Sequence, residues 1–288
     1  MEEEAPGETS TVRRPRIRLR AFRIGLRKLL VVIAIIAVGL GWMAAKLRRA
    51  REQAAAVRAI HKAHGTVTYD YLDHFDPMAD HSTAKPPGPR WLRSWLGDDV
   101  LASVSRVDFF RYEEIADGDL KHLAALSDLE DLSVIGGRGV TDAGLIALER
   151  LTKLNRVRLV EVPVTDAGLV HLRRLRHLES LDLGGTGITD AGLAELERFR
   201  DLKVLDLGHT RVTAAGLEHL KGLTKLRFLD LTVTPMTDAD LEPLKGMRSL
   251  KYLGLGGTFV TDAGERTIRE ALPGCQVTWW HRVPDGRR

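Results

Sequence analysis

The sequence predicts an α/β solenoid of about seven stacked coils, preceded by one transmembrane helix. Two observations predict it. A fixed period of 20 to 50 residues indicates a repeat architecture, and a Thr-Asp-Ala-Gly-Leu pattern recurs here with small variations every 24 residues. An uncharged apolar run, residues 29–45, lies upstream of the repeats. The threonines of the pattern are Thr141, Thr165, Thr189, Thr213, Thr237 and Thr261.

One period encodes a strand, a turn and a short helix. In residues 175–198, Leu181-Asp182-Leu183 alternates apolar and polar, which is typical of a half-buried strand with its leucines inward. Thr186 follows at a turn, where its hydroxyl is expected to bond backbone groups of the next coil. Thr189 suits a helix N-cap, and Asp190 complements the positive end of the helix dipole. A single coil cannot bury its leucines alone, so the coils must stack.

The repeats resemble a known family. The phrase Ile-Thr-Asp-Ala-Gly-Leu-Ala-Glu-Leu, residues 188–196, is similar to the cysteine-containing subclass of leucine-rich repeats in F-box adaptors. The 24-residue bacterial form of the repeat matches more closely, including its ending Leu-Pro-Gly-Cys-Gln-Val at residues 272–277. The resemblance covers about residues 100–280 and implies a leucine-rich-repeat horseshoe, with the strands lining its concave face. Residues 27–110 resemble the anchor, stalk and Pro-rich loop of one bacterial membrane group, which supplies architecture and no chemistry.

Aligning the leucines predicts one strand per coil. Consecutive strands are 24 residues apart, except that the first two spacings are 25. In the last helix Glu265 replaces the core leucine, as suits an end coil that faces water. The predicted strands are Val107–Phe109, Leu132–Val134, Val157–Leu159, Leu181–Leu183, Leu205–Leu207, Leu229–Leu231 and Leu253–Leu255, with Val277–Trp279 as the terminal strand.

Six regions follow from these patterns. They are a basic cytoplasmic N-terminal segment (1–28), a transmembrane signal-anchor helix (29–45), a helical stalk (46–64), a strand with a Pro-rich loop and N-terminal cap (65–100), the leucine-rich-repeat domain (101–280) and a flexible tail (281–288).

The apolar run is interpreted as an uncleaved membrane anchor. Basic residues flank it on both sides, and 17 uncharged residues are the short end of the range for a span. A cleaved signal peptide is the alternative, but Trp42 and Met43 stand where a cleavage site needs small residues. Residues 13–28 carry eight basic side chains and residues 46–62 carry six, so the positive-inside rule narrowly favours repeats outside the cytoplasm.

Charge and motifs exclude several functions. Residues 1–64 hold 14 Lys+Arg against 5 Asp+Glu, whereas the rest of the chain holds 29 against 34. The repeats are therefore mildly acidic, and nucleic-acid binding is not expected. No nucleophile elbow, phosphate loop or zinc-protease motif occurs, and the single cysteine, Cys275, can form no intramolecular disulfide. We expect no enzyme activity, cofactor, resident metal or small-molecule substrate.

Candidate binding residues lie between the strand leucines, where side chains point onto the predicted concave face. One row runs Ser133, Arg158, Asp182, Asp206, Asp230, Gly254, and the neighbouring row runs Asp131, Arg156, Ser180, Val204, Phe228, Tyr252. Three stacked aspartates repel one another unless a basic partner or cation compensates them. The competing interpretation is that aspartate is simply tolerated on a solvated face. The proposed partner site comprises Arg158, Asp182, Asp206, Asp230, Phe228 and Tyr252.

Three other groups of residues favour structural roles. His122, His171 and His219 share one helix position but lie two coils apart, which is too far for shared metal coordination. The acidic and histidine run of residues 70–81 has no metal-site spacing and is interpreted as a solvated loop. Trp91 and Trp95 are expected to cover the leucine edge of the first coil, with a membrane-interface role as the alternative.

The sequence thus predicts a single-pass membrane protein that presents a non-catalytic protein-binding module to an unidentified protein partner. Two alternatives stay open. The array self-associates or packs against envelope proteins without a discrete ligand, or it faces the cytoplasm as an adaptor.

Overall fold

The structure is a computed structural model that describes residues 26–70, 89–91, 94, 102–110 and 115–279. The chain divides into two compact units, Met1–Ala45 and Lys46–Arg288. The predictions for the basic segment before residue 26, for most of the Pro-rich loop, for Trp95 and for the tail 281–288 lie outside the described residues.

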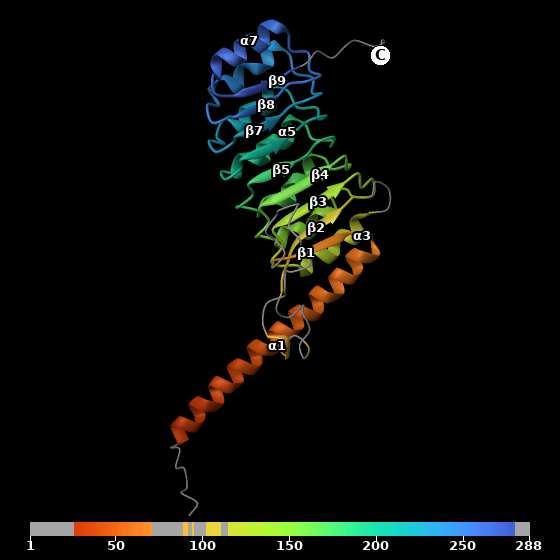
Figure 1. Cartoon of the computed structure of the whole chain (residues 1–288), viewed down its shortest axis with the longest axis vertical. Coiled ribbons are helices and arrows are strands. Elements are labelled where there is room, and N and C mark those ends of the chain that lie inside the picture. Colours follow the sequence, from red (N-terminus) through yellow and green to blue (C-terminus); the bar gives the residue numbers. More distant parts are fainter. Residues whose placement is uncertain (1–25, 71–88, 92–93, 95–101, 111–114, 280–288) are drawn as a thin grey trace, which may run out of the picture. The chain divides into compact units, whose positions relative to one another are not determined.

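The N-terminal unit contains the first part of helix α1, which runs Leu26–Lys62 (Figure 1). Its apolar side chains are exposed, with Ile35 at 66% and Val38 at 74% of their full accessible area. Soluble proteins rarely expose a continuous apolar surface of this kind, whereas a bilayer would cover it. By length and composition, α1 is the one helix within the described ranges that could cross a membrane.

The second unit is built on a nine-stranded sheet whose strands follow chain order (Figure 1). The first two strands pair antiparallel, and every later pair is parallel and in the register that the leucine alignment predicts. The strands are β1 (Thr66–Tyr69), β2 (Val104–Phe109), β3 (Asp131–Ile135), β4 (Arg156–Val160), β5 (Ser180–Asp182), β6 (Val204–Asp206), β7 (Phe228–Asp230), β8 (Tyr252–Gly254) and β9 (Gln276–Thr278).

Each coil returns to the next strand through a short helical segment. Most segments begin with one α-helical turn and continue as 3₁₀-helix, which advances about 2.0 Å per residue and so spans the coil with few residues. The α-helical parts are α3 (Asp117–Leu120), α4 (Asp166–Leu169), α5 (Asp190–Leu193), α6 (Ala214–Leu217) and α7 (Asp262–Ala271). The 3₁₀ parts are η4 (Lys121–Ala125), η5 (Gly144–Arg150), η6 (Val170–Leu172), η7 (Ala194–Arg198), η8 (Glu218–Leu220) and η9 (Asp238–Gly246).

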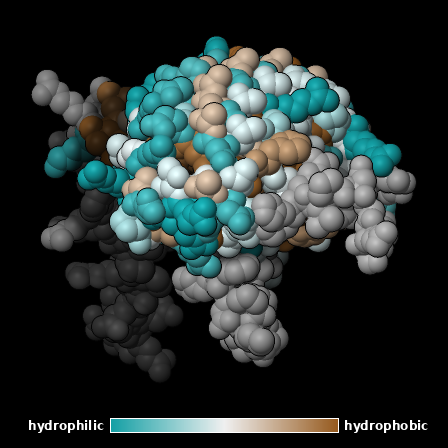
Figure 2. Space-filling view, turned by 90° about the horizontal axis from the view of Figure 1, so that it is seen from above, coloured by the Kyte–Doolittle hydropathy of each residue, from teal (hydrophilic) through white to brown (hydrophobic). Residues whose placement is uncertain are grey.

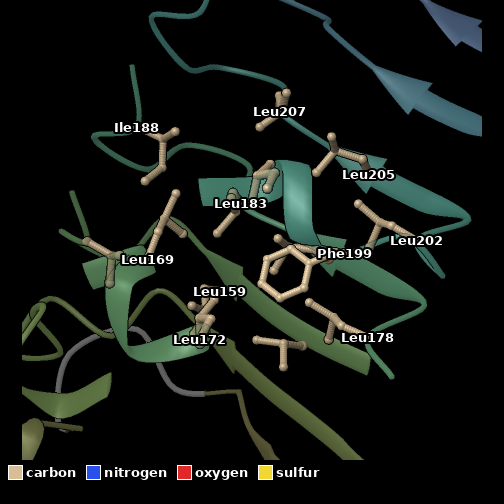
Figure 3. Close-up of a cluster of buried hydrophobic side chains, with 14 of the residues drawn as sticks. Leu159, Leu169, Leu172, Leu178, Leu183, Ile188, Phe199, Leu202, Leu205 and Leu207 are labelled. Carbon is tan, nitrogen blue, oxygen red and sulfur yellow. The ribbon is translucent and has the colours of Figure 1, made fainter. Parts of the chain in front are cut away.

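The core is a continuous stack of leucines between strands and helical segments. Leu181, Leu205 and Leu229 occupy adjacent positions on neighbouring strands, and all three have zero exposed area. Figure 3 shows this packing around Phe199, which fills the position that Leu175 holds one coil earlier. Each fully buried leucine contributes roughly 1.5–3 kcal/mol, so the repeated leucines account for why the array needs several coils.

The recurring threonine and aspartate bond between coils. This bond takes the place of the predicted cap at α4, α5 and α6, whereas the Thr261 side chain caps α7 as the pattern predicts. Thr189 is at the N-cap position of α5 but makes no side-chain cap bond. Instead its backbone N–H and its hydroxyl donate to the two carboxylate oxygens of Asp166 in the preceding coil, at 2.8 and 2.6 Å. The same pair of bonds joins Thr213 to Asp190. The recurring pattern therefore ties each coil to the one before it.

Glycine in the pattern follows from this clamp. A Cβ atom at Gly192 would lie 2.3 Å from a carboxylate oxygen of Asp166, so no side chain fits there. Two consecutive coils break the pattern at positions that face each other. Ala214 replaces the aspartate of one coil, and Asp240 replaces the glycine of the next coil. Asp240 then accepts hydrogen bonds from Thr237 in its own coil and from the backbone N–H of Ala214. The two exchanges compensate each other.

The turn threonine also acts locally rather than between coils as predicted. The hydroxyl of Thr186 donates to the carbonyl of Leu183 in its own coil at 2.6 Å. Thr210 and Leu207 repeat this bond one coil later, also at 2.6 Å. A buried hydroxyl without a partner is costly, so this bond permits threonine to be buried at the turn.

The first coil is covered by the stalk part of α1 and by β1, not by Trp91 as predicted. Trp91 is 68% exposed, whereas Ala56, Val57 and Ile60 of α1 join the hydrophobic core. A Cβ atom at Gly65 would lie 2.5 Å from the Phe109 ring, so the chain can approach the core closely only with glycine at that position.

The last coil is closed by polar groups of α7. Val277 sits on β9 with its carbonyl on the side away from β8, and Arg269 donates to that carbonyl at 2.7 Å. Glu265 forms an ion pair with Arg269, consistent with the prediction that this glutamate marks an end coil. Figure 2 looks onto the end that carries α7 and shows hydrophilic residues over much of the described surface. An exposed strand edge invites pairing with another chain, and this arginine occupies it.

Candidate functional site on the open face of the sheet

The sheet register places the predicted site residues on one face. Arg158, Asp182, Asp206 and Asp230 are paired in sequence across β4 to β7, and Gly254 follows on β8. Val204, Phe228 and Tyr252 form the neighbouring row two residues earlier on β6 to β8. These two rows, together with Arg156 and Ser180, are called the open face. The predicted arrangement of candidate residues is confirmed, while their role in binding stays a prediction.

Each of the three aspartates has a structural bond that the sequence analysis did not foresee. Their carboxylates accept the backbone N–H two residues further on, at 3.1 Å for Gly184, 2.8 Å for Gly208 and 2.8 Å for Thr232. Aspartate commonly stabilises a turn in this way. Its recurrence as the last residue of β5, β6 and β7 therefore has a local cause. Asp230 also accepts a hydrogen bond from the Thr232 hydroxyl.

Asp182 and Asp206 carry a desolvation cost that this bond does not fully offset. Burial raises the pKa of Asp182, with the Gly184 bond and the nearby Arg158 opposing the shift. Burial and, to a smaller extent, the neighbouring carboxylates of Asp182 and Asp230 raise the pKa of Asp206 to about 6, against the effect of the Gly208 bond. The like-charge stack thus holds one carboxylate that titrates close to neutral pH.

Charge compensation is uneven along the open face. At its N-terminal end, Asp131 lies between Arg106 and Arg156, with nitrogen–oxygen distances of 3.0 and 2.9 Å. Arg158 reaches Asp182 at only 3.8 Å, and its side chain is 41% exposed. Within the described ranges, Asp206 and Asp230 take part in no ion pair. Negative charge is therefore uncompensated on β6 and β7.

Beside those aspartates lies a pair of stacked aromatic rings. The ring centroids of Phe228 and Tyr252 are 4.3 Å apart and the planes differ by 4°. The Tyr252 hydroxyl also bonds the Thr278 hydroxyl at 2.9 Å, which fixes the ring's orientation. Val204, next in the row, is 37% exposed. Together these side chains make a flat, rigid apolar surface next to the acidic row.

A cleft of about 260 Å³ opens where β5 to β7 end. Asp182 and Asp206 line it together with residues that the sequence analysis did not single out: Val160, Glu161, Gly184, Gly185, Gly208, His209 and Thr232. Glu161 and His209 have left-handed backbones, with φ of 53° and 57°, at the position that Gly185 occupies in the coil between them. That glycine, two residues after the end of the predicted strand Leu181–Leu183, was the available signal for this turn.

The other candidate groups have ordinary structural partners. His171 contacts Glu149 and His219 contacts Glu197 in the preceding coil, at 2.7 and 2.6 Å, so these histidines join neighbouring coils. Asp70 accepts the backbone N–H of Ser103 at 3.3 Å, and the rest of the 70–81 run lies outside the described residues. Among the residues that the structure describes, no group of three His, Cys, Asp or Glu side chains could hold a metal ion.

Comparisons with known proteins agree with the repeat assignment. A family model described as "Leucine Rich repeat" matches residues 174–196. No curated protein sequence matches the chain. Among solved structures, internalin C2 of Listeria monocytogenes is similar at 24% identity and a TM-score of 0.46, over 59% of this chain and 77% of that one.

Two further solved structures give similar values. An internalin (inlF) of the same Listeria strain matches at 22% identity and a TM-score of 0.43, over 58% of this chain and 51% of that one. A leucine-rich-repeat protein of Leptospira interrogans matches at 20% identity and a TM-score of 0.44, over 55% and 38%. Because these TM-scores are below 0.5, the fold assignment rests on the coils themselves. With one leucine-lined parallel strand per coil and a family model matched at residues 174–196, the second unit is a leucine-rich-repeat solenoid.

Proposed function

We propose that this chain is a membrane-anchored protein-binding module that captures its partner on the open face, which we infer to be the concave side. The observation that carries the proposal is the contrast between the two sides of each strand. Leucines such as Leu205 and Leu229 are completely buried. The residues between them include two aspartates that form no ion pair within the described residues, and a half-buried aromatic stack. Aromatic side chains ringed by polar groups are typical of binding hot spots.

No chemistry is proposed for this surface. Backbone N–H groups hold its carboxylates, and the Thr232 hydroxyl also donates to Asp230. A stack of similar coils supplies area and shape, which suits binding.

The test compares capture by matched variants. Full-length protein in detergent is used to capture partners from membrane and soluble extracts, followed by quantitative mass spectrometry. The double variant Asp206→Asn/Asp230→Asn removes charge but keeps an oxygen that can accept the Gly208 and Thr232 N–H groups. Proteins captured by the wild type and by the control Asp201→Asn should be lost from the double variant. Identical capture by all three proteins would refute the site.

We further propose that α1 anchors the chain in a membrane and that the repeats lie outside the cytoplasm. The exposed apolar surface of α1 supports an anchor, and the excess of basic residues before residue 29 supports this orientation. A reporter that is active only outside the cytoplasm, fused after Arg288, should be active. Activity from a cytoplasm-specific reporter at the same position would reverse the orientation.

A further inference from the structure

We infer that the partner of the open face is an extended peptide segment with an arginine or lysine two residues from an aromatic or large aliphatic side chain. This inference rests on the proposed function and adds the chemistry of the partner. It follows from three features of the face: its uneven charge compensation, the shape of its cleft and the spacing of its two rows.

Charge compensation indicates a cation from outside the chain. The fold pairs Asp131 with two arginines on the same sheet, so arginine is compatible with open-face positions. At β6 and β7 the chain places no such residue: Val204 and Phe228 occupy the positions equivalent to Arg156. A partner cation beside Asp206 would offset the burial cost that this carboxylate carries in the free protein.

The cleft has the size and lining for a long basic side chain. Its 260 Å³ exceeds the roughly 30 Å³ share of one water molecule several-fold, and no lysine or arginine lines it. Glycine keeps the carboxylates accessible: a Cβ atom at Gly208 would lie 3.1 Å from an oxygen of Asp206, and one at Gly184 would lie 3.3 Å from Asp182. The carboxylate oxygens of Asp182 and Asp206 are acceptors, as a guanidinium or ammonium requires.

The spacing of the rows indicates an extended segment. Phe228 and Asp230 lie two residues apart on one strand and face the same side, roughly 6.6 Å from each other. A partner in extended conformation repeats its own side chains at the same interval, so residues i and i+2 can meet the aromatic row and the acidic row together. The stacked rings already lie flat and ordered, so contact with them costs little conformational entropy.

The arginines at the other end of the face determine where the basic residue of the partner binds. Arg156 and Arg158 are 47% and 41% exposed, and each is engaged by one aspartate on one side only. A basic residue of the partner is repelled there and attracted to β6 and β7. The basic residue of the partner therefore binds at β6 and β7, and acidic residues of the partner are tolerated towards β4.

The experiment uses a random dodecapeptide library displayed on phage, with the full-length chain in lipid nanodiscs and empty nanodiscs as the reference. The wild type should enrich peptides with a basic residue two positions from an aromatic or large aliphatic one. Asp206→Asn/Asp230→Asn should abolish the basic preference and weaken the best selected peptide by about tenfold or more, while the aromatic preference remains. Phe228→Ser should abolish the aromatic preference, while the basic preference remains. Asp201→Asn and Phe259→Ser, which change the same residue types away from the open face, should bind as the wild type does.

The outcomes separate the two proposals. If the wild type enriches no peptide over empty nanodiscs, this inference is wrong, and the proposed function then depends on the capture experiment described above. If peptides are enriched without the basic preference, or if that preference survives in the double asparagine variant, the inference is wrong and peptide binding itself stands. Circular dichroism of each variant checks that the coils remain folded.

Discussion

At the scale of single residues, Asp206 shows how one side chain joins fold and function. It bonds the Gly208 N–H and so completes a turn, yet burial and two neighbouring aspartates raise its pKa to about 6 from an ordinary 3.8. Between pH 4 and 6 the folded chain therefore binds this proton more tightly than the unfolded chain does. The contribution of Asp206 to stability is most favourable below pH 4 and is lost as the pH rises through 6.

This predicts a pH-dependent gain for Asp206→Asn. Relative to the wild type, the variant should become more stable as the pH rises from 4 to 7, by about 1 kcal/mol, since solvent screens a half-buried carboxyl. Urea unfolding of residues 46–288 at a series of pH values measures the difference. Asp201→Asn is the matched control: a hydrogen bond from Lys225 lowers the pKa of Asp201 below its ordinary 3.8, so the stability that this carboxylate contributes is lost only at lower pH. The stability difference for this variant should therefore stay nearly flat from about pH 5 to 7. A flat difference for Asp206→Asn would mean that its pKa is ordinary.

At the scale of elements, the clamp between coils explains most of the repeated pattern. The aspartate of one coil holds the threonine of the next, and the glycine gives it room. Local reasoning assigned these residues to helix capping, because a threonine before a short helix is the usual N-cap. Thr189 and Asp166 lie in different coils and become neighbours only when the coils stack. The clamp therefore could not be predicted from the sequence of one coil. Leucine positions, by contrast, predicted the strand register correctly.

The paired exchange at Ala214 and Asp240 gives a direct test of the clamp. Asp240→Gly should destabilise the domain by about 1–2 kcal/mol, because it removes the acceptor of the Thr237 and Ala214 N–H groups. Ala214→Asp alone should also destabilise, since its carboxylate meets that of Asp240. The double variant rebuilds the ordinary clamp and should recover most of the loss, with a coupling free energy of about 1–3 kcal/mol in unfolding experiments. Additive losses would show that the two positions act independently.

At the scale of the whole molecule, the sequence predicted the architecture better than its ends. The repeating leucines determine the coils, and alternation along each strand identifies the open face, so every candidate site residue was found on it. Two things were missed for physical reasons. The cleft depends on left-handed turns at Glu161 and His209, where no glycine marks the turn. The second is the cover of the first coil, which depends on which of several apolar segments reaches it. The sequence predicted Trp91 as this cover, but Trp91 is exposed and Ile60 is buried instead.

The stalk's role as that cover predicts where the folded domain begins. Residues 46–288 should unfold cooperatively as a monomer, because Ala56, Val57 and Ile60 cover the first coil. Residues 65–288 should be less stable by about 4 kcal/mol, from the lost burial of these side chains, and should associate through the uncovered core.

Ile60→Ala in residues 46–288 tests the same contact without shortening the domain, with an expected loss of about 2–5 kcal/mol in stability. Ile146→Ala is the control: this side chain is 54% exposed, so truncation should change stability by less than about 0.5 kcal/mol. Urea unfolding and light scattering provide both measurements, and equal stability of the two fragments would show that the stalk is only a spacer.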